Sequence, residues 1–134
     1  MEQLEAMLRQ NPAHPFAMIH MGQLREGDVQ RLIENHKNVY FLTSHANPVV
    51  ISGSNQPWTQ MFEGDVLARG WQDLMVKYPD RFVFAIDNVW PEHWGDYYLQ
   101  QVECWRKAFA ALPREVANAV AHGNAERLWG IPRQ

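Results

Sequence analysis

Arg81-Phe82-Val83-Phe84-Ala85-Ile86-Asp87-Asn88 is an apolar run, rich in aromatic and β-branched side chains, that ends in an acid. No polar residue interrupts it between Arg81 and Asp87, a pattern typical of a strand that is covered on both faces in a parallel sheet. A carboxylate at the end of such a strand is costly to bury unless a metal, a proton or a cation pairs with it. Because parallel α/β folds build their sites at the carboxyl ends of strands, Asp87 is the first candidate for chemistry.

Two more apolar runs precede this one, and each also ends in polar groups. The run Phe16–Gly22 predicts a buried strand with His20 near its end. The run Asn38–Ser44 predicts another strand, which ends in hydroxyls and is followed by His45.

Between and after these runs, apolar residues recur at steps of three and four, the spacing of an amphipathic helix. The expected helices are Met1–Gln10, Arg25–His36, a part of Trp58–Tyr78, Pro91–Leu112, Pro113 to about His122, and a last turn from Asn124. Strands that alternate with helices predict βαβ units and a parallel sheet, and therefore an α/β fold.

Smaller patterns add local expectations. The stretch 46–57 is rich in Asn, Pro, Ser and Gly and predicts a loop, with a short extra strand at Val49–Ile51 left open. Gly123 is predicted to cap the C-terminus of a helix, and Leu128 and Trp129 to pack inward after it. The remaining histidines near element ends are expected at the surface: His14, His36 and His122.

The composition is that of one ordinary globular domain of 134 residues. The formal net charge of −3 gives no sign of a nucleic-acid footprint or a membrane-surface patch. The single cysteine, Cys104, cannot form an internal disulfide, which agrees with a reducing compartment. The acidic N-terminus lacks the basic start and apolar centre of a signal peptide, so the expected location is the cytoplasm.

His20 and Asp87 are the two candidate site residues, because each ends an apolar strand and parallel strands end on the same rim. A histidine and a carboxylate there can ligate a divalent metal or share a proton. The alternatives are structural: a hydrogen-bonded histidine at a strand end, and an aspartate that only caps a helix or forms a turn.

Ser44 and His45 are a weaker pair. Neighbours in a strand point to opposite faces, so these two side chains are poorly placed to act as nucleophile and base. Cys104 lies within a helical aromatic stripe and is expected to be a small buried hydrophobe.

Four stretches carry a family resemblance: FAMIHMGQL (16–24), NVYFLTS (38–44), YPDRFVFAIDN (78–88) and AHGNAERLW (121–129). In order and spacing they resemble the amidohydrolase family, and more closely its amidohydrolase-related branch (amidohydrolase 2) of metal-dependent hydrolases with a TIM-barrel fold. The resemblance extends from about Leu4 to Trp129.

The resemblance implies that the three strands correspond to strands 6, 7 and 8 of a (β/α)8 barrel. It implies that His20 lies beside a metal-bound water and assists catalysis, and that Asp87 is a metal ligand or the base for that water. The implied metal is usually zinc, which lowers the pKa of its bound water. The implied reactions are hydrolysis of amides, lactones and related bonds, and non-oxidative decarboxylation of aromatic acids.

The chain departs from the family pattern because no His-x-His, which the family carries on its first strand, occurs in the sequence. A complete barrel takes about 250 residues, and a catalytic zinc usually has three protein ligands. The sequence therefore predicts a single C-terminal part-barrel domain over residues 1–134, acting on a small molecule when a complementing N-terminal half-barrel is supplied. The alternative is a catalytically inactive truncated barrel, an oligomeric or interaction module whose self-association hides its strand edges.

Overall fold

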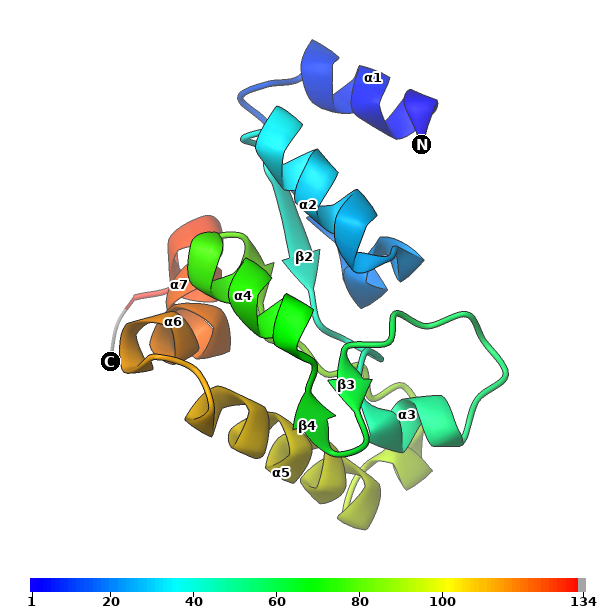
Figure 1. Cartoon of the computed structure of the whole chain (residues 1–134). Helices are drawn as coiled ribbons and strands as arrows, with labels where there is room; N and C mark the ends of the chain where they lie inside the picture. The colour runs from blue at the N-terminus through cyan, green and yellow to red at the C-terminus, as the bar shows by residue number, and fades with distance from the viewer. Residues whose placement is uncertain (133–134) are drawn as a thin grey trace.

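The computed structural model describes residues 1–132, and Figure 1 shows the arrangement of its elements. In chain order these are α1 (Glu2–Gln10), β1 (Phe16–Met18), η1 (Ile19–Gln23), α2 (Glu26–Asn35), β2 (Val39–Leu42), α3 (Pro48–Ser52), β3 (Phe62–Glu63), β4 (Val66–Leu67), α4 (Arg69–Lys77), β5 (Phe82–Val83), η2 (Pro91–His93), α5 (Asp96–Ala110), α6 (Arg114–Asn118), η3 (Ala119–Gly123) and α7 (Asn124–Trp129).

The centre of the fold is a three-stranded parallel sheet in the order β1-β2-β5. Phe16 pairs with Val39 at the start of β1, and Leu42 pairs with Val83 at the end of β2. The predicted α/β class and the parallel direction of all three strands are therefore confirmed. Parallel strands need long crossovers, and α2 and α4 are the helices of the two crossovers here.

Only one face of this sheet is fully covered. Val39 and Phe41 of β2 are completely buried in the core with residues of α2, α4 and α5. Their neighbours Tyr40 and Leu42 are only partly buried, and Ala17 of β1 is exposed. The strand β5 is covered on both faces, as its apolar run predicts, because its adjacent residues Phe82 and Val83 are both buried. In β1 and β2 the second face is covered only in part.

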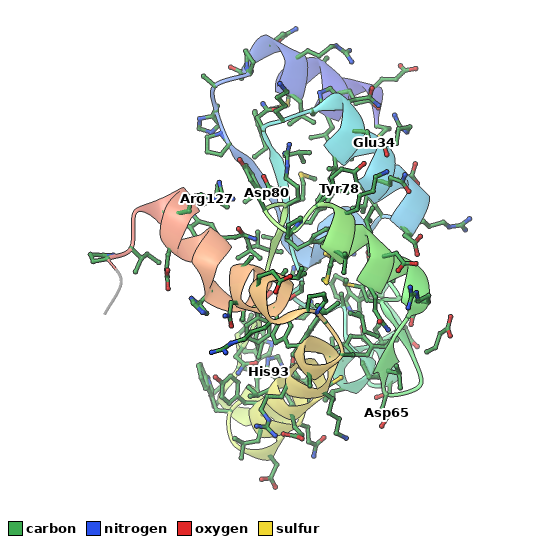
Figure 2. All side chains as sticks on the ribbon, turned by 60° about the vertical axis from the view of Figure 1, so that its left-hand side comes forward. Glu34, Asp65, Tyr78, Asp80, His93 and Arg127 are labelled. Carbon is green, nitrogen blue, oxygen red and sulfur yellow. The ribbon has the colours of Figure 1, made fainter. Side chains whose placement is uncertain are left out.

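The helices form because their apolar residues fall on one stripe. In α2 the buried residues are Val29, Leu32 and Ile33, and in α4 they are Trp71, Leu74 and Met75. The two helices lie side by side (Figure 1), and a cluster of side chains ties their ends together. Glu34 Oε1 accepts hydrogen bonds from Gln30 Nε2 at 2.9 Å, Lys77 Nζ at 3.1 Å and Tyr78 Oη at 2.8 Å. Glu34 and Tyr78 are labelled in Figure 2.

The helix α1 is attached through one buried amide. Asn38 Nδ2 donates to the carbonyl oxygens of Leu8 (3.1 Å), Asn11 (2.9 Å) and His14 (3.2 Å). An ion pair between Glu5 and Arg31 of α2 adds a second connection. These contacts hold the N-terminal helix against the end of the sheet where β2 begins.

The first strand is shorter than its apolar run predicts. It ends at Met18, and the chain then enters a left-handed turn in which His20, Met21, Gly22 and Gln23 have φ values of 54°, 55°, 64° and 54°. The predicted strand Phe16–Gly22 is thus wrong beyond Met18, because a strand cannot contain this backbone geometry. In the same way, β5 covers only Phe82–Val83, and residues 84–88 continue as an irregular segment.

Residues 48–52 form the helix α3, so the extra strand considered for Val49–Ile51 is absent. Asn47 Oδ1 accepts from the backbone N–H groups of Val49 and Val50 at 3.1 and 3.2 Å, and Pro48 occupies the first helical turn. An asparagine cap followed by proline is a strong helix start. Here it outweighs the strand preference of the β-branched residues.

The second half of the chain also differs in detail from the predicted helices. The helix expected over Pro91–Leu112 is interrupted at Gly95, whose φ is 79°, and α5 starts only at Asp96. Gly123 does not end a helix as a C-terminal cap, because its φ is −58° and the helical chain passes through it into α7. Trp129 is 53% exposed rather than packed inward, whereas the predicted surface residue His36 is buried.

The hairpin β3–β4, with Gly64 at its turn, was not predicted from the sequence. Its strands are two residues each, too short to give an alternating pattern. Within residues 1–132, no helix combines the length and apolarity that a membrane crossing requires.

Candidate metal centre

The loops that follow β1, β2 and β5 meet at the carboxyl ends of the strands, as expected for a parallel sheet. Thr43 joins two of them: its N–H donates to the Val83 carbonyl at 3.0 Å, and its Oγ1 accepts from the Ala85 N–H at 3.1 Å. The side chain thus continues the ladder of β2 and β5 for one more step. This places the residues after Thr43 opposite the segment that carries Asp87.

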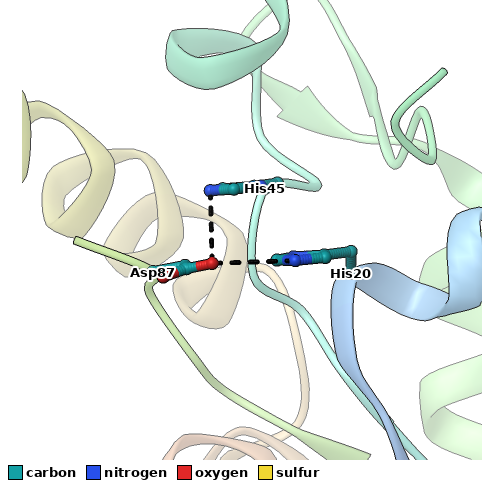
Figure 3. Close-up of side chains that lie close together, drawn as sticks. All are labelled: His20, His45 and Asp87. Carbon is teal, nitrogen blue, oxygen red and sulfur yellow. Dashed lines mark ion pairs between the residues drawn. The ribbon is translucent and has the colours of Figure 1, made fainter. Parts of the chain in front are cut away.

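Three side chains from these loops come together, as Figure 3 shows. Asp87 Oδ2 lies 3.6 Å from His20 Nε2 and 3.7 Å from His45 Nε2. The two imidazoles are stacked, with centroids 4.3 Å apart and planes 3° from parallel. We call this group the His20–His45–Asp87 cluster.

Ser44 holds His20 in place. Its Oγ accepts from the His20 backbone N–H at 3.1 Å and lies 3.0 Å from His20 Nδ1. With Nδ1 engaged by the hydroxyl, Nε2 is the ring nitrogen that faces Asp87. An imidazole fixed through one nitrogen in this way presents the other nitrogen to a metal or a reacting group.

His45 is a partly buried imidazole with a free nitrogen. Burial lowers the pKa of His45, the nearby His20 lowers it further, and the Asp87 carboxylate opposes both effects. Its Nδ1 is buried and has no hydrogen-bond partner among the residues described. Trp58 packs on both imidazoles, with centroids 5.0 Å from His20 and 4.5 Å from His45.

A chain of buried amides connects the two loops that carry His45 and Asp87. Because Asn47 Oδ1 is used to cap α3, its Nδ2 donates to Gln101 Oε1 at 3.2 Å. Gln101 Nε2 in turn donates to Asn88 Oδ1 at 3.5 Å. Gln101 is fully buried in α5, and Asn88 Nδ2 has no partner in the described part of the chain. The helix cap therefore fixes the direction of every hydrogen bond in this network.

The cluster has the composition of a site for a divalent metal. Two imidazole nitrogens and one carboxylate oxygen can be chosen that all lie within 4.8 Å of one another. Nitrogen and carboxylate ligands suit zinc and related ions, and three protein ligands with an open position form a catalytic site. The unpartnered Nδ1 of His45 and the Ser44 contact of His20 are compatible with ligation, so the residues present fit a metal.

The structure brings together the two residues singled out from the sequence, His20 and Asp87. It adds His45, which the sequence reasoning missed because it treated residues 44 and 45 as neighbours in a strand. The backbone of His45 has a φ of 62°, so the strand has already ended and the ring turns toward Asp87. A histidine directly after an apolar run was the available signal. Ser44 contacts His20 rather than His45.

The other candidates lie apart from the cluster. His14 and His122 are exposed, as predicted, and His122 pairs with Glu126 in α7. Cys104 is buried in α5, and burial raises the pKa of its thiol, as expected for a packing residue.

Comparison with known proteins gives one match. The family model described as Amidohydrolase matches residues 1–131. No curated protein and no solved structure matches the chain. Since the match covers nearly the whole sequence and includes all three members of the cluster, the chain belongs to the amidohydrolase family.

Proposed function

We propose that the chain supplies the sixth, seventh and eighth strands of a (β/α)8 barrel and part of the metal site of a hydrolase. The observation that carries the proposal is the His20–His45–Asp87 cluster at the carboxyl rim of a parallel sheet. Membership of the amidohydrolase family supports a hydrolase-type function in general.

The open face of the sheet supports the barrel. Along each strand of a closed barrel, residues that point inward alternate with residues that point outward. The inward-pointing residues are covered by the other strands of the barrel. Ala17, Tyr40 and Leu42 are the residues that such strands would cover.

The outer strand β1 has one neighbour in the described structure, so it has an edge that a further strand can pair with. At the outer edge of β5, the Phe84 N–H donates to the Val120 carbonyl at 2.8 Å and the Phe82 carbonyl accepts from Asn124 Nδ2 at 2.8 Å, so a further strand would have to replace these two contacts.

We assign roles from the geometry. Asp87 Oδ2 and His45 Nε2 would hold the metal, zinc by family resemblance, which when bound supplies a water acidic enough to act as a nucleophile near neutral pH. His20, fixed through Nδ1 by Ser44, would accept or donate a proton at Nε2. The proposed reaction is hydrolysis of an amide, lactone or related bond in a small molecule, or a related non-oxidative decarboxylation.

The first test is zinc binding by calorimetry. We expect the isolated chain to bind zinc weakly, and Asp87→Asn or His45→Gln to weaken binding by at least about 10-fold, because each removes a ligand. His14→Gln is the matched control, since His14 is exposed and its ring packs edge-on against Phe16, away from the cluster. Cluster variants that bind zinc as tightly as the wild type would disprove the site.

The second test supplies the missing half. Co-expression with an N-terminal half-barrel that carries His-x-His should give an assembly that binds zinc tightly and hydrolyses substrate. In that assembly Asp87→Asn should lower the rate by about 10²–10⁴-fold, the range for a lost catalytic acid or base. An unchanged rate would show that Asp87 has no part in the chemistry.

A second candidate function is an inactive interaction module. The observation that favours it is a group of exposed apolar side chains around η2 and the start of α5: Val89, Trp90, Trp94 and Leu99, which are 59–62% exposed. Such a group is typical of an association surface. The two functions are separated by zinc binding, which the module does not require.

A further inference from the structure

A cavity is connected to the His20–His45–Asp87 cluster through one residue, and no member of the cluster lines it. It has a volume of about 630 Å³ and lies between the start of α2, residues 57–60, the hairpin β3–β4 and the start of α4. Its connection to the cluster is Trp58, which lines the cavity and also packs on both imidazoles. The volume falls within the range of about 300–1,000 Å³ found for small-molecule sites.

Flat aromatic side chains form its walls: Trp58, Phe62 and Trp71. Both indoles are held by hydrogen bonds, from Trp58 Nε1 to Ser54 Oγ at 3.1 Å and from Trp71 Nε1 to the Gln60 carbonyl at 2.9 Å. Phe62 packs edge-on against the buried ring of Trp105, with centroids 5.2 Å apart. The walls therefore keep their shape without a ligand.

Two further contacts connect the segments that line the cavity. Thr59 Oγ1 donates to the Leu24 carbonyl at 2.9 Å, which ties the 57–60 segment to the start of α2. The Glu26 carboxylate lies against Gly70 in the first turn of α4, where a Cβ on Gly70 would collide with it. The absence of a side chain at Gly70 is what allows the carboxylate to lie there.

The charges of the lining disfavour an anionic ligand. The N-terminus of a helix attracts negative charge, and at α4 the chain's own Glu26 already takes that position. Glu63 is a second acid in the lining, against one cation, Arg25. The cavity thus combines aromatic walls with a surplus of negative charge.

We propose that this cavity binds an uncharged aromatic or heteroaromatic ring of the substrate against Trp58, the residue through which the cavity is connected to the cluster. The inference rests on the proposed hydrolase function for the ring's place in a substrate, and the binding itself is independent of it. Stacking and edge-to-face packing contribute about 0.5–1.5 kcal/mol beyond apolar burial, or about 2- to 13-fold in affinity. The substrate class is an aryl or heteroaryl amide, lactone or related compound whose ring carries no charge.

The test is an NMR titration of the full chain with three small probes that contain no bond to hydrolyse. Phenol is the uncharged flat ring, cyclohexanol is its saturated counterpart, and benzoate is the charged ring. We expect phenol to bind at least about 3-fold more tightly than cyclohexanol and benzoate. Its shift changes should fall on residues 23–26, 57–63 and 68–71. Equal affinity for phenol and cyclohexanol, or shift changes elsewhere, would overturn the proposal.

Variants then connect the ring to the wall. Trp58→Leu should lose at least half of the affinity for phenol, whereas Trp58→Phe should retain it, because a ring remains. Trp129→Leu is the control, since Trp129 is exposed on α7 and does not line the cavity. If Trp58→Leu binds phenol as tightly as the wild type, Trp58 is not part of the subsite.

Asp87→Asn separates this inference from the proposed function. It should leave phenol binding unchanged while it weakens zinc binding. A wild-type chain that binds zinc but does not prefer phenol would refute the ring subsite alone. A wild-type chain that prefers phenol but does not bind zinc would refute the metal centre alone.

Discussion

His20, Met21, Gly22 and Gln23 form a turn whose backbone is left-handed at each residue. For a residue with a Cβ this geometry costs about 1–2 kcal/mol, so the turn is strained at three positions. The strain is offset by full burial of Met21 and by the two contacts between Ser44 and His20. Neither compensation is visible in the local sequence, which explains why the run Phe16–Gly22 predicts a strand throughout.

Alanine substitutions at Gly22 and Gly27 test the left-handed turn, because only Gly22 lies in it. Gly22→Ala should destabilise the fold by about 1 kcal/mol, because φ is 64° and the new Cβ would lie 3.3 Å from the Leu24 side chain. Gly27→Ala should stabilise it by about 0.5–1 kcal/mol, because Gly27 lies in α2 with no atom within 4 Å of a Cβ. Urea denaturation measures both, and shifts of the same sign would contradict the assignment of the turn.

The candidate residues were predicted unequally at this scale. His20 and Asp87 could be found because an apolar run followed by a polar residue marks a strand end. His45 also follows an apolar run, but its ring turns toward Asp87 only because its φ is 62°, which neither composition nor spacing indicates. The contact of the Trp58 ring with both imidazoles could not be predicted either, because it depends on the conformation of the irregular segment 54–60.

At the scale of elements, α5 connects the loops of His45 and Asp87 through hydrogen bonds of Gln101 with Asn47 and Asn88. Gln101→Leu would leave Asn47 Nδ2 and Asn88 Oδ1 without their buried partner, at a cost of about 1–3 kcal/mol. It should also weaken zinc binding, because the loops of His45 and Asp87 lose their connection. Urea denaturation and zinc calorimetry measure the two effects.

Two controls accompany this variant. Gln101→Glu should retain zinc binding, because a carboxylate accepts from Asn47 and the Asn88 amide can turn to donate. Cys104→Ala changes another buried residue of α5 outside the network and should leave zinc affinity unchanged. Equal zinc affinity in Gln101→Leu and the wild type would show that the network is structural only.

The connection between α2 and α4 makes stability depend on pH. Hydrogen bonds from Gln30, Tyr78 and Lys77 lower the pKa of Glu34 to about 2 from a reference value of 4.5. A depressed folded-state pKa contributes stability that is complete above the unfolded value and is lost as pH falls toward the folded value. Wild-type stability should therefore fall between pH 4.5 and 2 more steeply than that of Glu34→Gln.

Urea midpoints measured across that pH range provide the check. Glu92→Gln, at an exposed position in η2, is the control and should follow the wild-type curve. Parallel curves for Glu34→Gln and the wild type would mean that the contacts of Glu34 do not persist in solution.

Element types were largely predictable, and element ends were not. The three strands follow from uninterrupted apolar runs, and the helices α1, α2, α4 and α5 follow from the periodicity of a helix that buries one stripe. The helix α3 was missed because its cap, in which Asn47 Oδ1 accepts two backbone hydrogen bonds, outweighs the strand preference of three β-branched residues. The break at Gly95 depends on a φ of 79°, which a helical pattern alone does not reveal.

At the scale of the whole molecule, the sequence predicted the class of sheet but not its exposure. The covered face of the sheet is built from α2, α4 and α5, as the βαβ pattern requires. On the second face Val83 of β5 is buried, whereas Tyr40 and Leu42 of β2 are only partly buried and Ala17 of β1 is exposed. An apolar run predicts that a strand is buried, but it does not show whether the covering residues belong to the same chain or to another.

The exposed strand residues and the exposed apolar group around η2 together predict the mass of the chain in solution. The purified chain should self-associate, so light scattering should give a mass above the 15.6 kDa of a monomer. Trp90→Ser combined with Trp94→Ser should shift the equilibrium toward the monomer, because both indoles are 60% exposed in one apolar group. Trp129→Ser is the control on α7. A wild-type chain that is a well-folded monomer at all concentrations would argue against the interaction module.

Asn38 has a consequence for how the N-terminal segment is retained. A single amide nitrogen gathers three carbonyls from residues 8, 11 and 14, so those three contacts are made or lost in one event. We therefore expect the segment 1–15 to dock and to separate as one unit rather than residue by residue. Its release would expose Leu8, which is 1% exposed in the docked helix and belongs to the hydrophobic core.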